Sequence, residues 1–216
     1  MALSTHIPAL EARGIEVSYD MPEGVVLFND ANLEKAIRDA LGIPTELLKK
    51  EDLAGLKELR VDNKGKPESA KISDLTGLEH CTSLTNLELK SNQLSDLSPL
   101  SNLTNLTRLQ LDDNQLSDLS PLSNLTDMGY LSIDRNQLSD LSPLVNLATG
   151  YLDLRSNQIS DISALVENTG ISGKINLKDN PLNNTALSTH IPALEARGIK
   201  VEYDMPEGVV LFHQRC

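Results

Sequence analysis

The amino-acid sequence predicts an α/β solenoid, in which short repeats stack along one axis and helices cover both ends. A segment of 22 residues from Leu103, LTNLTRLQLDDNQLSDLSPLSN, is followed in frame from Leu125 by LTDMGYLSIDRNQLSDLSPLVN. A period of this length is typical of solenoids. The chain of 216 residues has no Trp and only six Tyr and Phe residues, so its core must consist of Leu, Ile and Val. Stacked identical layers need no larger side chains.

Each repeat contains one predicted strand. Leu109 and Leu111 alternate with the polar residues Arg108, Gln110 and Asp112, and this period of two is typical of a strand with one buried face. The following LSDLSPL then returns the chain along the opposite side. A proline in each copy limits helix formation there; these prolines are Pro99, Pro121 and Pro143.

An Asn follows every predicted strand. A side-chain amide has two donors and an acceptor, so we expect stacked Asn residues to bond the backbone where each strand bends into its loop. This structural ladder comprises Asn92, Asn114, Asn136, Asn157 and Asn180, with Asn63 preceding it. A second ladder, Asp96, Asp118, Asp140 and Asp161, is expected to bond loop amides locally. Cys81 takes the place of Leu103, Leu125 and Leu147 and is predicted to be a buried apolar residue.

Both ends of a solenoid need covers, because a terminal repeat otherwise exposes apolar side chains and an unpaired strand. At the front, Leu33, Ile37 and Leu41 recur at helical spacing, with Asp30 as the expected N-cap and Gly42 as the expected stop.

At the back, Ile191 and Leu194 form the apolar face of a second predicted helix. Thr189 is its expected cap and Gly198 its expected stop, and residues 199–201 supply one more strand.

A long duplication links the two ends. Residues 2–28 recur at 186–212 with only two differences, which gives an offset of 184 residues. We interpret residues 2–28 as the closing cap of a preceding module in a tandem array, and an engineered duplication is the alternative. Only one matching surface, around Ile175 and Leu177, is available for two caps.

The leading copy must therefore bury its apolar residues elsewhere. These residues are Ile7, Leu10, Ile15 and Val17. We expect the leading copy to pack against the opening helix, to exchange into a neighbouring molecule, or to stay partly disordered.

These observations divide the chain into five segments. They are the duplicated cap segment 1–28, the helical N-terminal cap 29–52, the repeats 53–185, the C-terminal cap helix and strand 186–212, and the tail 213–216.

The pattern L-x-x-L-x-x-L-x-L-x-x-N resembles the leucine-rich repeats of the bacterial 22-residue class found in internalin-type surface proteins. The resemblance includes NDANLEKAIRDALGIP as the helical N-terminal cap. It implies a right-handed, curved solenoid with parallel strands on the concave face and short 3-10 or loop segments on the convex side. It also implies that the parent protein is extracellular or at the cell surface.

Composition and motifs exclude several function classes. A net charge of -12 argues against binding to nucleic acid or an anionic membrane, and no apolar run is long enough for membrane insertion. The sequence has no phosphate loop, paired-Cys metal spacing or clustered catalytic residues, so we predict no enzyme, cofactor or metal site. Cys216, as the last residue, is a potential intermolecular cross-link.

The outward strand positions are the most varied part of the sequence. Among these twenty positions seven are basic and seven acidic, so this face does not repel an ordinary protein partner. Tyr130 and Tyr151 occupy the same outward column in adjacent repeats, and Tyr is enriched at binding hot spots. An accidental pair on an exposed sheet is the alternative. The candidate partner-binding residues are Glu88, Lys90, Arg108, Gln110, Asp112, Tyr130, Asp134, Tyr151, Asp153 and Arg155.

Two hypotheses for function follow. The first is a protein-binding module that uses the concave strands as a rigid platform, because twenty outward side chains approach the size of a standard interface. The second is a structural spacer, or an engineered scaffold, that self-associates head to tail or by exchanging its duplicated cap segments.

Overall fold

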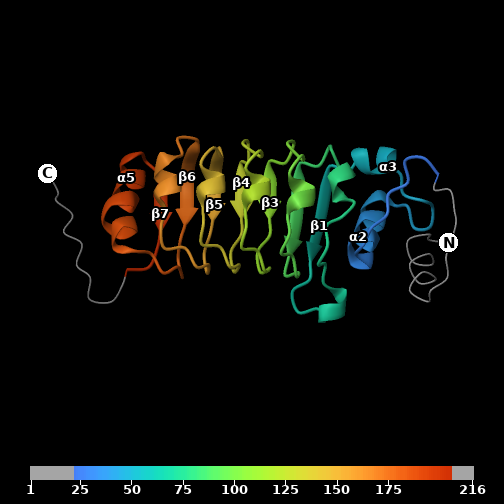
Figure 1. Cartoon of the computed structure of the whole chain (residues 1–216), viewed down its shortest axis with the longest axis horizontal. Coiled ribbons are helices and arrows are strands. Elements are labelled where there is room, and N and C mark those ends of the chain that lie inside the picture. The colour runs from blue at the N-terminus through green and yellow to red at the C-terminus, as the bar shows by residue number, and fades with distance from the viewer. Residues whose placement is uncertain (1–21, 206–216) are drawn as a thin grey trace.

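The computed structural model describes residues 22–205 as an elongated solenoid (Figure 1). Seven strands lie side by side in a single parallel sheet, and their order in the sheet is their order in the sequence. Helices α2 and α3 lie at one end and α5 lies at the other (Figure 1). The prediction of an α/β leucine-rich repeat solenoid is thereby confirmed.

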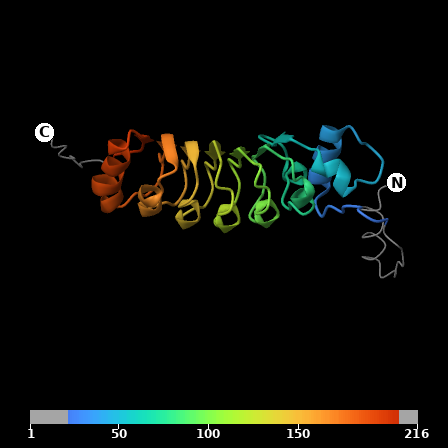
Figure 2. The same ribbon diagram turned by 90° about the horizontal axis from the view of Figure 1, so that it is seen from above.

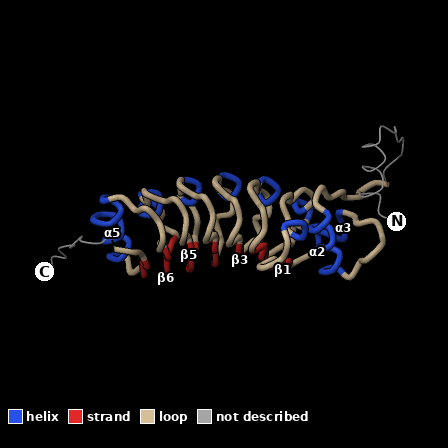
Figure 3. Tube along the Cα trace, turned by 90° about the horizontal axis from the view of Figure 1, so that it is seen from below, coloured by secondary structure: helices blue, strands red, loops and turns tan. Residues whose placement is uncertain are grey.

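The strands and the turns lie on opposite sides of the solenoid (Figures 2 and 3). The strands are β1 (Glu58–Asp62), β2 (Asn86–Lys90), β3 (Arg108–Gln110), β4 (Tyr130–Ser132), β5 (Thr149–Asp153), β6 (Ile171–Asn176) and β7 (Lys200–Glu202). The turn side carries the 3-10 helices η2 (Leu78–His80), η3 (Ser98–Leu100), η4 (Ser120–Leu122) and η5 (Ser142–Leu144), and the short helix α4 (Ser163–Glu167). Another 3-10 helix, η1 (Glu68–Ala70), lies in the loop after β1.

The core is a stack of leucine layers between these two sides. Leu87 pairs in register with Leu109, and Leu109 pairs with Leu131; all three side chains are buried. Cys81 is also fully buried, as its place in a leucine column predicts. Each layer therefore packs on the same residue type one repeat away.

The Asn ladder connects successive turns through the backbone. Asn114 accepts a hydrogen bond from the amide of Leu94 (3.0 Å) and donates to the carbonyls of Leu89 (2.9 Å) and Leu111 (3.0 Å). Asn136, Asn157 and Asn180 repeat this pattern of contacts. Asn92 accepts the amide of Ile72 (2.8 Å) and donates to the carbonyl of Lys90 (2.9 Å). Because these backbone groups are buried, the amide side chains satisfy donors and acceptors that water cannot reach.

Each ladder Asn follows a residue with left-handed backbone geometry, which turns the chain out of the strand. These residues are Ser91, Asp113, Arg135, Ser156 and Asp179, with φ between 51° and 59°. None is glycine, so every repeat carries a small local strain.

The Asp ladder organises the turn side. Asp96, Asp118 and Asp140 each accept a hydrogen bond from the amide of the Ser two residues later, at 2.8 Å, and Asp161 does the same at 3.0 Å. The local bonding that the sequence predicts is therefore present in all four repeats.

The N-terminal cap contains α2 (Ala31–Leu41) and α3 (Lys50–Ala54). Asp30 caps α2 by accepting hydrogen bonds from the amides of Asn32 (2.9 Å) and Leu33 (3.0 Å). Gly42 ends the helix with a φ of 69°. Leu33 and Ile37 are fully buried, so the predicted helix, cap and apolar face are confirmed.

The last residues of the leading duplicated segment pack into this cap. Val26 donates its amide to the carbonyl of Leu48 (2.9 Å), and Lys50 donates to the carbonyl of Gly24 (2.9 Å). The side chains of Val26 and Phe28 are buried in the core. Residues 24–28 are therefore part of the structure that covers the first repeat.

The C-terminal cap is one continuous helical segment followed by a strand. A π-helical turn, η6 (Ala186–His190), runs into α5 (Ile191–Ala196), and β7 follows. Thr189 is not the N-cap that the sequence predicts, because it lies inside the helical segment; the side chain of Asn183 accepts the amide of Ala186 (2.8 Å) instead. Gly198, the predicted stop, has a φ of 82°.

The repeat is irregular between β5 and β6, where the pairing register shifts between Thr149 and Tyr151. Gly173, with a φ of 68°, lies so close to the neighbouring strand that an added Cβ would be 2.3 Å from the carbonyl oxygen of Gly150. Asn168 supports the turn before β6 by donating to the carbonyls of Leu144 (2.6 Å) and Leu147 (2.8 Å).

Some expectations fall outside the described residues. They include the fate of the leading cap copy up to residue 21, with its apolar residues, and the tail with Cys216. The division of the chain into five segments stays a prediction.

Candidate functional site

We call the outward side of strands β1–β7 and of the residues that follow each of them the strand face. One column across it contains side chains that pair in register on adjacent strands: Arg108 with Tyr130, Tyr130 with Tyr151, and Tyr151 with Lys174. These four residues form what we call the ridge.

The two tyrosine rings of the ridge are stacked. Their centroids are 4.6 Å apart and their planes differ by 9°. The spacing follows from the parallel sheet, because in-register side chains on adjacent strands are separated by the distance between the strands. Stacked aromatic pairs contribute about 1 kcal/mol beyond the area that they bury.

A cation lies at each end of this stack. The guanidinium carbon of Arg108 is 3.9 Å from the ring centroid of Tyr130, and the Nζ atom of Lys174 is 5.8 Å from that of Tyr151. Both distances are within the range of cation–π attraction. The ridge is therefore a stack of two rings with a cation over each end.

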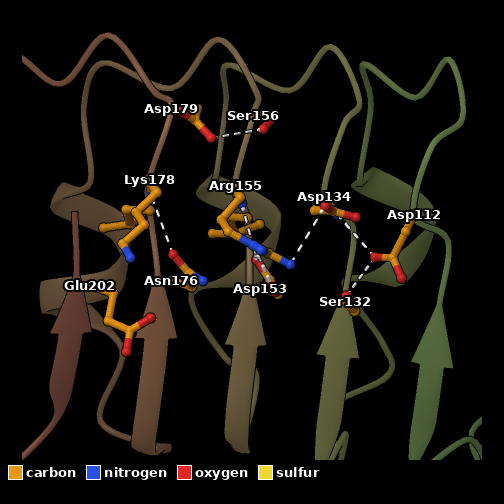
Figure 4. A network of polar contacts seen from close by, with 12 residues as sticks. Asp112, Ser132, Asp134, Asp153, Arg155, Ser156, Asn176, Lys178, Asp179 and Glu202 are labelled. Atoms are coloured by element: carbon orange, nitrogen blue, oxygen red, sulfur yellow. Dashed lines mark hydrogen bonds and ion pairs between the residues drawn. The ribbon is translucent and has the colours of Figure 1, made fainter. Parts of the chain in front are cut away.

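A polar network lies beside the ridge (Figure 4). Arg155 donates from Nε to Asp153 (2.9 Å) and also lies 3.6 Å from a carboxylate oxygen of Asp134. The hydroxyl of Tyr151 donates to Asp153 (3.2 Å), which joins the network to the ridge. Burial and the Asp153 carboxylate raise the pKa of Tyr151 to about 12, so its hydroxyl stays protonated at neutral pH.

A carboxylate pair continues this network toward β3. The hydroxyl of Ser132 donates to Asp112 (2.5 Å), and the amide of Asp134 donates to the same Asp112 oxygen (3.1 Å). Burial, with the negative charge of Asp112, raises the pKa of Asp134 to about 6. Arg135 and Arg155 oppose this shift without cancelling it, so the Asp134 carboxylate titrates just below neutral pH.

All ten partner-binding candidates from the sequence lie on β2–β5 or two residues after the end of β3, β4 or β5, so one face brings them together. Their accessibility differs, however. Arg108 is exposed, and Glu88, Lys90, Asp112, Tyr130, Tyr151 and Arg155 are half-buried. Gln110, Asp134 and Asp153 are buried, contrary to their expected exposure. The guanidinium of Arg155 contacts both carboxylates, and that of Arg108 donates to Gln110. These three support the surface and do not form it.

Two residues with a role in the structure of this region, Lys174 and Asn168, were not identified from the sequence. Lys174 appears among the outward positions but was not selected as a candidate, although its place in the Tyr151 column was a usable signal. Asn168 is buried with four hydrogen bonds, yet it lies off the position of the Asn ladder, so the repeat gave no indication of it.

A groove of about 640 Å³ lies between α2 and β1, away from the ridge. Leu59 and Ile72 contribute to its floor, and Lys35, Arg60 and Lys66 contribute to its polar lining. Within residues 22–205, no three His, Cys, Asp or Glu side chains come together as a metal-binding group. No helix in that part of the chain is long and apolar enough to cross a membrane.

Comparison with known proteins places these features in context. The family described as Leucine Rich repeats (2 copies) matches residues 104–146. An internalin (inlF) from Listeria monocytogenes has 28% sequence identity over 82% of this chain and 55% of its own, with a TM-score of 0.59. The functional domain of InlJ from the same organism, whose structure includes a cysteine ladder, has 26% identity over 74% of this chain and 39% of its own, with a TM-score of 0.55. No curated protein sequence matches the chain.

The fold, the repeats and these matches show that this chain is similar to internalin-like bacterial leucine-rich repeat proteins. The chain spans about half of the length of the internalin and about two fifths of that of InlJ.

Proposed function

We propose that this chain is a non-enzymatic protein–protein interaction module that binds its partner on the concave strand face, with the ridge at the centre of the contact. The ridge carries this proposal, because it combines two of the residue types enriched at binding hot spots, Tyr and Arg, in one rigid column.

Rigidity is the physical advantage of the ridge. Tyr130 and Tyr151 hold each other in place, and the hydrogen bond from Tyr151 to Asp153 ties the stack to the Arg155 network. Binding to a preordered surface loses less side-chain entropy, so more of the contact energy remains as affinity.

The charges of the strand face indicate the chemistry of the partner. Within the described residues, Lys90 and Arg155 are paired with carboxylates of the same face. Arg108, by contrast, has no carboxylate oxygen within 4.0 Å in that part of the chain and lies exposed beside the ring of Tyr130. An acidic side chain of a protein partner over Arg108, flanked by apolar contacts to the tyrosine edges, fits this arrangement.

The test compares three immobilised proteins as baits for one mixture of solubilised cell-surface proteins. They are the unchanged chain, the ridge variant Arg108→Glu with Tyr130→Ala, and the turn-side control Asp118→Ala with Asp140→Ala. Each protein that the unchanged chain retains is purified, and its Kd is measured against all three baits.

We expect the ridge variant to bind such a partner roughly 30-fold or more weakly, which corresponds to about 2 kcal/mol. The turn-side control should bind normally, and urea unfolding should show that both variants are folded. Equal affinity of a partner for the ridge variant and the unchanged chain would remove the ridge from the interface.

A structural spacer that self-associates end to end through its duplicated cap segments is the second candidate. Supporting it, the large apolar residues exposed in the described part of the chain are Leu27 and Met205, which lie at opposite ends of the solenoid. Sedimentation over a range of concentrations, with reductant to exclude a Cys216 cross-link, separates the candidates: open head-to-tail chains grow with concentration, whereas a monomeric interaction module does not.

A further inference from the structure

The packing of residues 22–28 fixes the phase of the 184-residue repeat. This segment, PEGVVLF, recurs without change at 206–212. In its first copy it belongs to the N-terminal cap, where it covers the first repeat. We propose that one unit of the repeat runs from residue 22 to residue 205, and that residues 206–212 form the opening segment of the N-terminal cap of a following unit.

Backbone pairing is the first support for this assignment. Val25 forms an antiparallel bridge with Lys49, and the amide of Val26 donates to Leu48 next to it. Lys50 in turn donates to Gly24. The segment is therefore paired with the chain that leads into α3, in an element of the N-terminal cap.

Side-chain packing is the second support. The ring of Phe28 fills the space above Gly77, where an added Cβ would lie 2.6 Å from the ring. Val26 and Phe28 are 7% and 6% exposed, so they are core residues of this end of the solenoid.

The residues that follow the segment complete the cap. Asp30 caps α2, and its other carboxylate oxygen accepts the amide of Ser73 (2.8 Å), which anchors the helix to the first repeats. After the second copy the sequence continues as HQRC, with Gln214 in the place of Asp30.

The content of the unit agrees with this phase. The 184 residues from 22 to 205 include one complete set of caps and repeats. In an array of such units, β7 of one unit and the opening segment of the next are joined by only a few residues, without a linker.

Exposed apolar residues at both ends are an independent observation. Leu27 is 40% and Met205 is 46% exposed. In a continuous array, Met205 would stand six residues before Leu211, the counterpart of Leu27. The junction between a unit and a second copy would therefore bring together the apolar side chains that a single unit leaves exposed.

Matched substitutions in the two copies test the proposal. In the 216-residue chain, we expect Val26→Asp to lower the melting temperature by roughly 5–10 °C, because it places a charge in the core. Leu27→Asp, next to it but exposed, should lower the melting temperature by only about 1–2 °C. Val210→Asp, at the identical position of the second copy, should leave the melting temperature unchanged.

The decisive measurement is the same Val210→Asp substitution in a two-unit chain, in which residues 29–216 follow Phe212. There we expect calorimetry to show half of the unfolding heat shifted down by roughly 5–10 °C, because residue 210 now lies under the α2 and α3 of the second unit. A Val210→Asp effect in the 216-residue chain equal to that of Val26→Asp would overturn the proposal, since residues 206–212 would then belong to the C-terminal cap. Unchanged unfolding of the two-unit chain would overturn it as well.

Discussion

The turn side and the strand face of the solenoid use the same repeat differently. On the turn side, Leu97, Leu119 and Leu141 have nearly the same backbone angles, with φ of -107°, -106° and -108°. On the strand face, one column changes from Arg108 through two tyrosines to Lys174. A repeated backbone geometry requires the same residue in each repeat only where the side chain supports that backbone. The outward side chains of the strand face do not have this role, so they can vary and are available for recognition.

The largest loss in the free energy of unfolding is expected for a substitution in the Asn ladder. Asn136 accepts the amide of Leu116 (2.9 Å) and donates to the carbonyls of Leu111 (3.0 Å) and Asp134 (3.1 Å), so Asn136→Ala leaves several buried backbone groups unsatisfied. We expect a loss of about 3 kcal/mol or more in the free energy of unfolding, measured with urea. The control Asn105→Ala removes an exposed hydrogen bond and should cost under about 1 kcal/mol. Similar losses for the two variants would contradict the structural role of the ladder.

The irregular turn between β5 and β6 should be nearly as sensitive. Gly173→Ala would place a Cβ against the carbonyl of Gly150 in a backbone conformation that L-residues rarely adopt. We expect a loss of about 2 kcal/mol or more. Gly65→Ala, with a similar φ but nothing within 4 Å of the added Cβ, isolates the backbone cost of about 1 kcal/mol. A Gly173→Ala loss no larger than that of Gly65→Ala would show that the close approach to β5 is unimportant.

Replacing the buried carboxylate of Asp134 on the strand face should raise the free energy of unfolding at neutral pH, whereas the two substitutions above lower it. Because the pKa of Asp134 is raised to about 6 in the folded chain, from a usual value of about 4, the folded state binds its proton more tightly than the unfolded state. The contribution of Asp134 to stability is therefore fully present below about pH 4 and is lost as pH rises through about 6.

We therefore expect Asp134→Asn to stabilise the fold by about 1 kcal/mol at pH 7.5 and to have no such effect at pH 4. Urea titrations at both pH values measure this difference. Asp118→Asn is a control of opposite sign, since hydrogen bonds from Ser120 lower the pKa of Asp118. Destabilisation by Asp134→Asn at pH 7.5 would mean that its ion pairs with the arginines dominate over burial.

The tyrosine stack should contribute least to folding. A double-mutant cycle of Tyr130→Ala and Tyr151→Ala should give a coupling free energy of about 0.5–1.5 kcal/mol, because the rings contact each other over a face. The unfolding free energies of both single variants and of the double variant provide the measurement. A coupling near zero would show that the stack is not formed in solution.

Local pattern was sufficient for much of the fold. Asp30 and Gly42 were found as helix boundaries because a capping side chain and a left-handed glycine act on their own turn. Thr189 was misassigned as a cap because the helical segment begins earlier, at Asn184, and the side chain of Asn183 accepts the amide of Ala186. The start of a helix is ambiguous in sequence when two polar residues precede the same apolar face.

The candidate site was only partly predictable. The sequence placed Tyr130 and Tyr151 in one column, because the period of the repeat assigns them the same position. The positions of Arg108 and Lys174 over the rings, and the burial of Gln110 and Asp153, depend on side-chain conformations that the repeat pattern does not specify.

The sequence by itself determined the leucine layers, the Asn and Asp ladders and the position of the outward columns, because each follows from a periodic pattern acting on neighbouring backbone. Only the tertiary structure decided which outward side chains reach solvent and where residues 24–28 pack. Both depend on contacts between segments that are distant in sequence: Phe28 with Gly77, and Arg155 with Asp134. Such contacts carry no periodic signal, since their energy arises only when the stacked repeats bring the partners together.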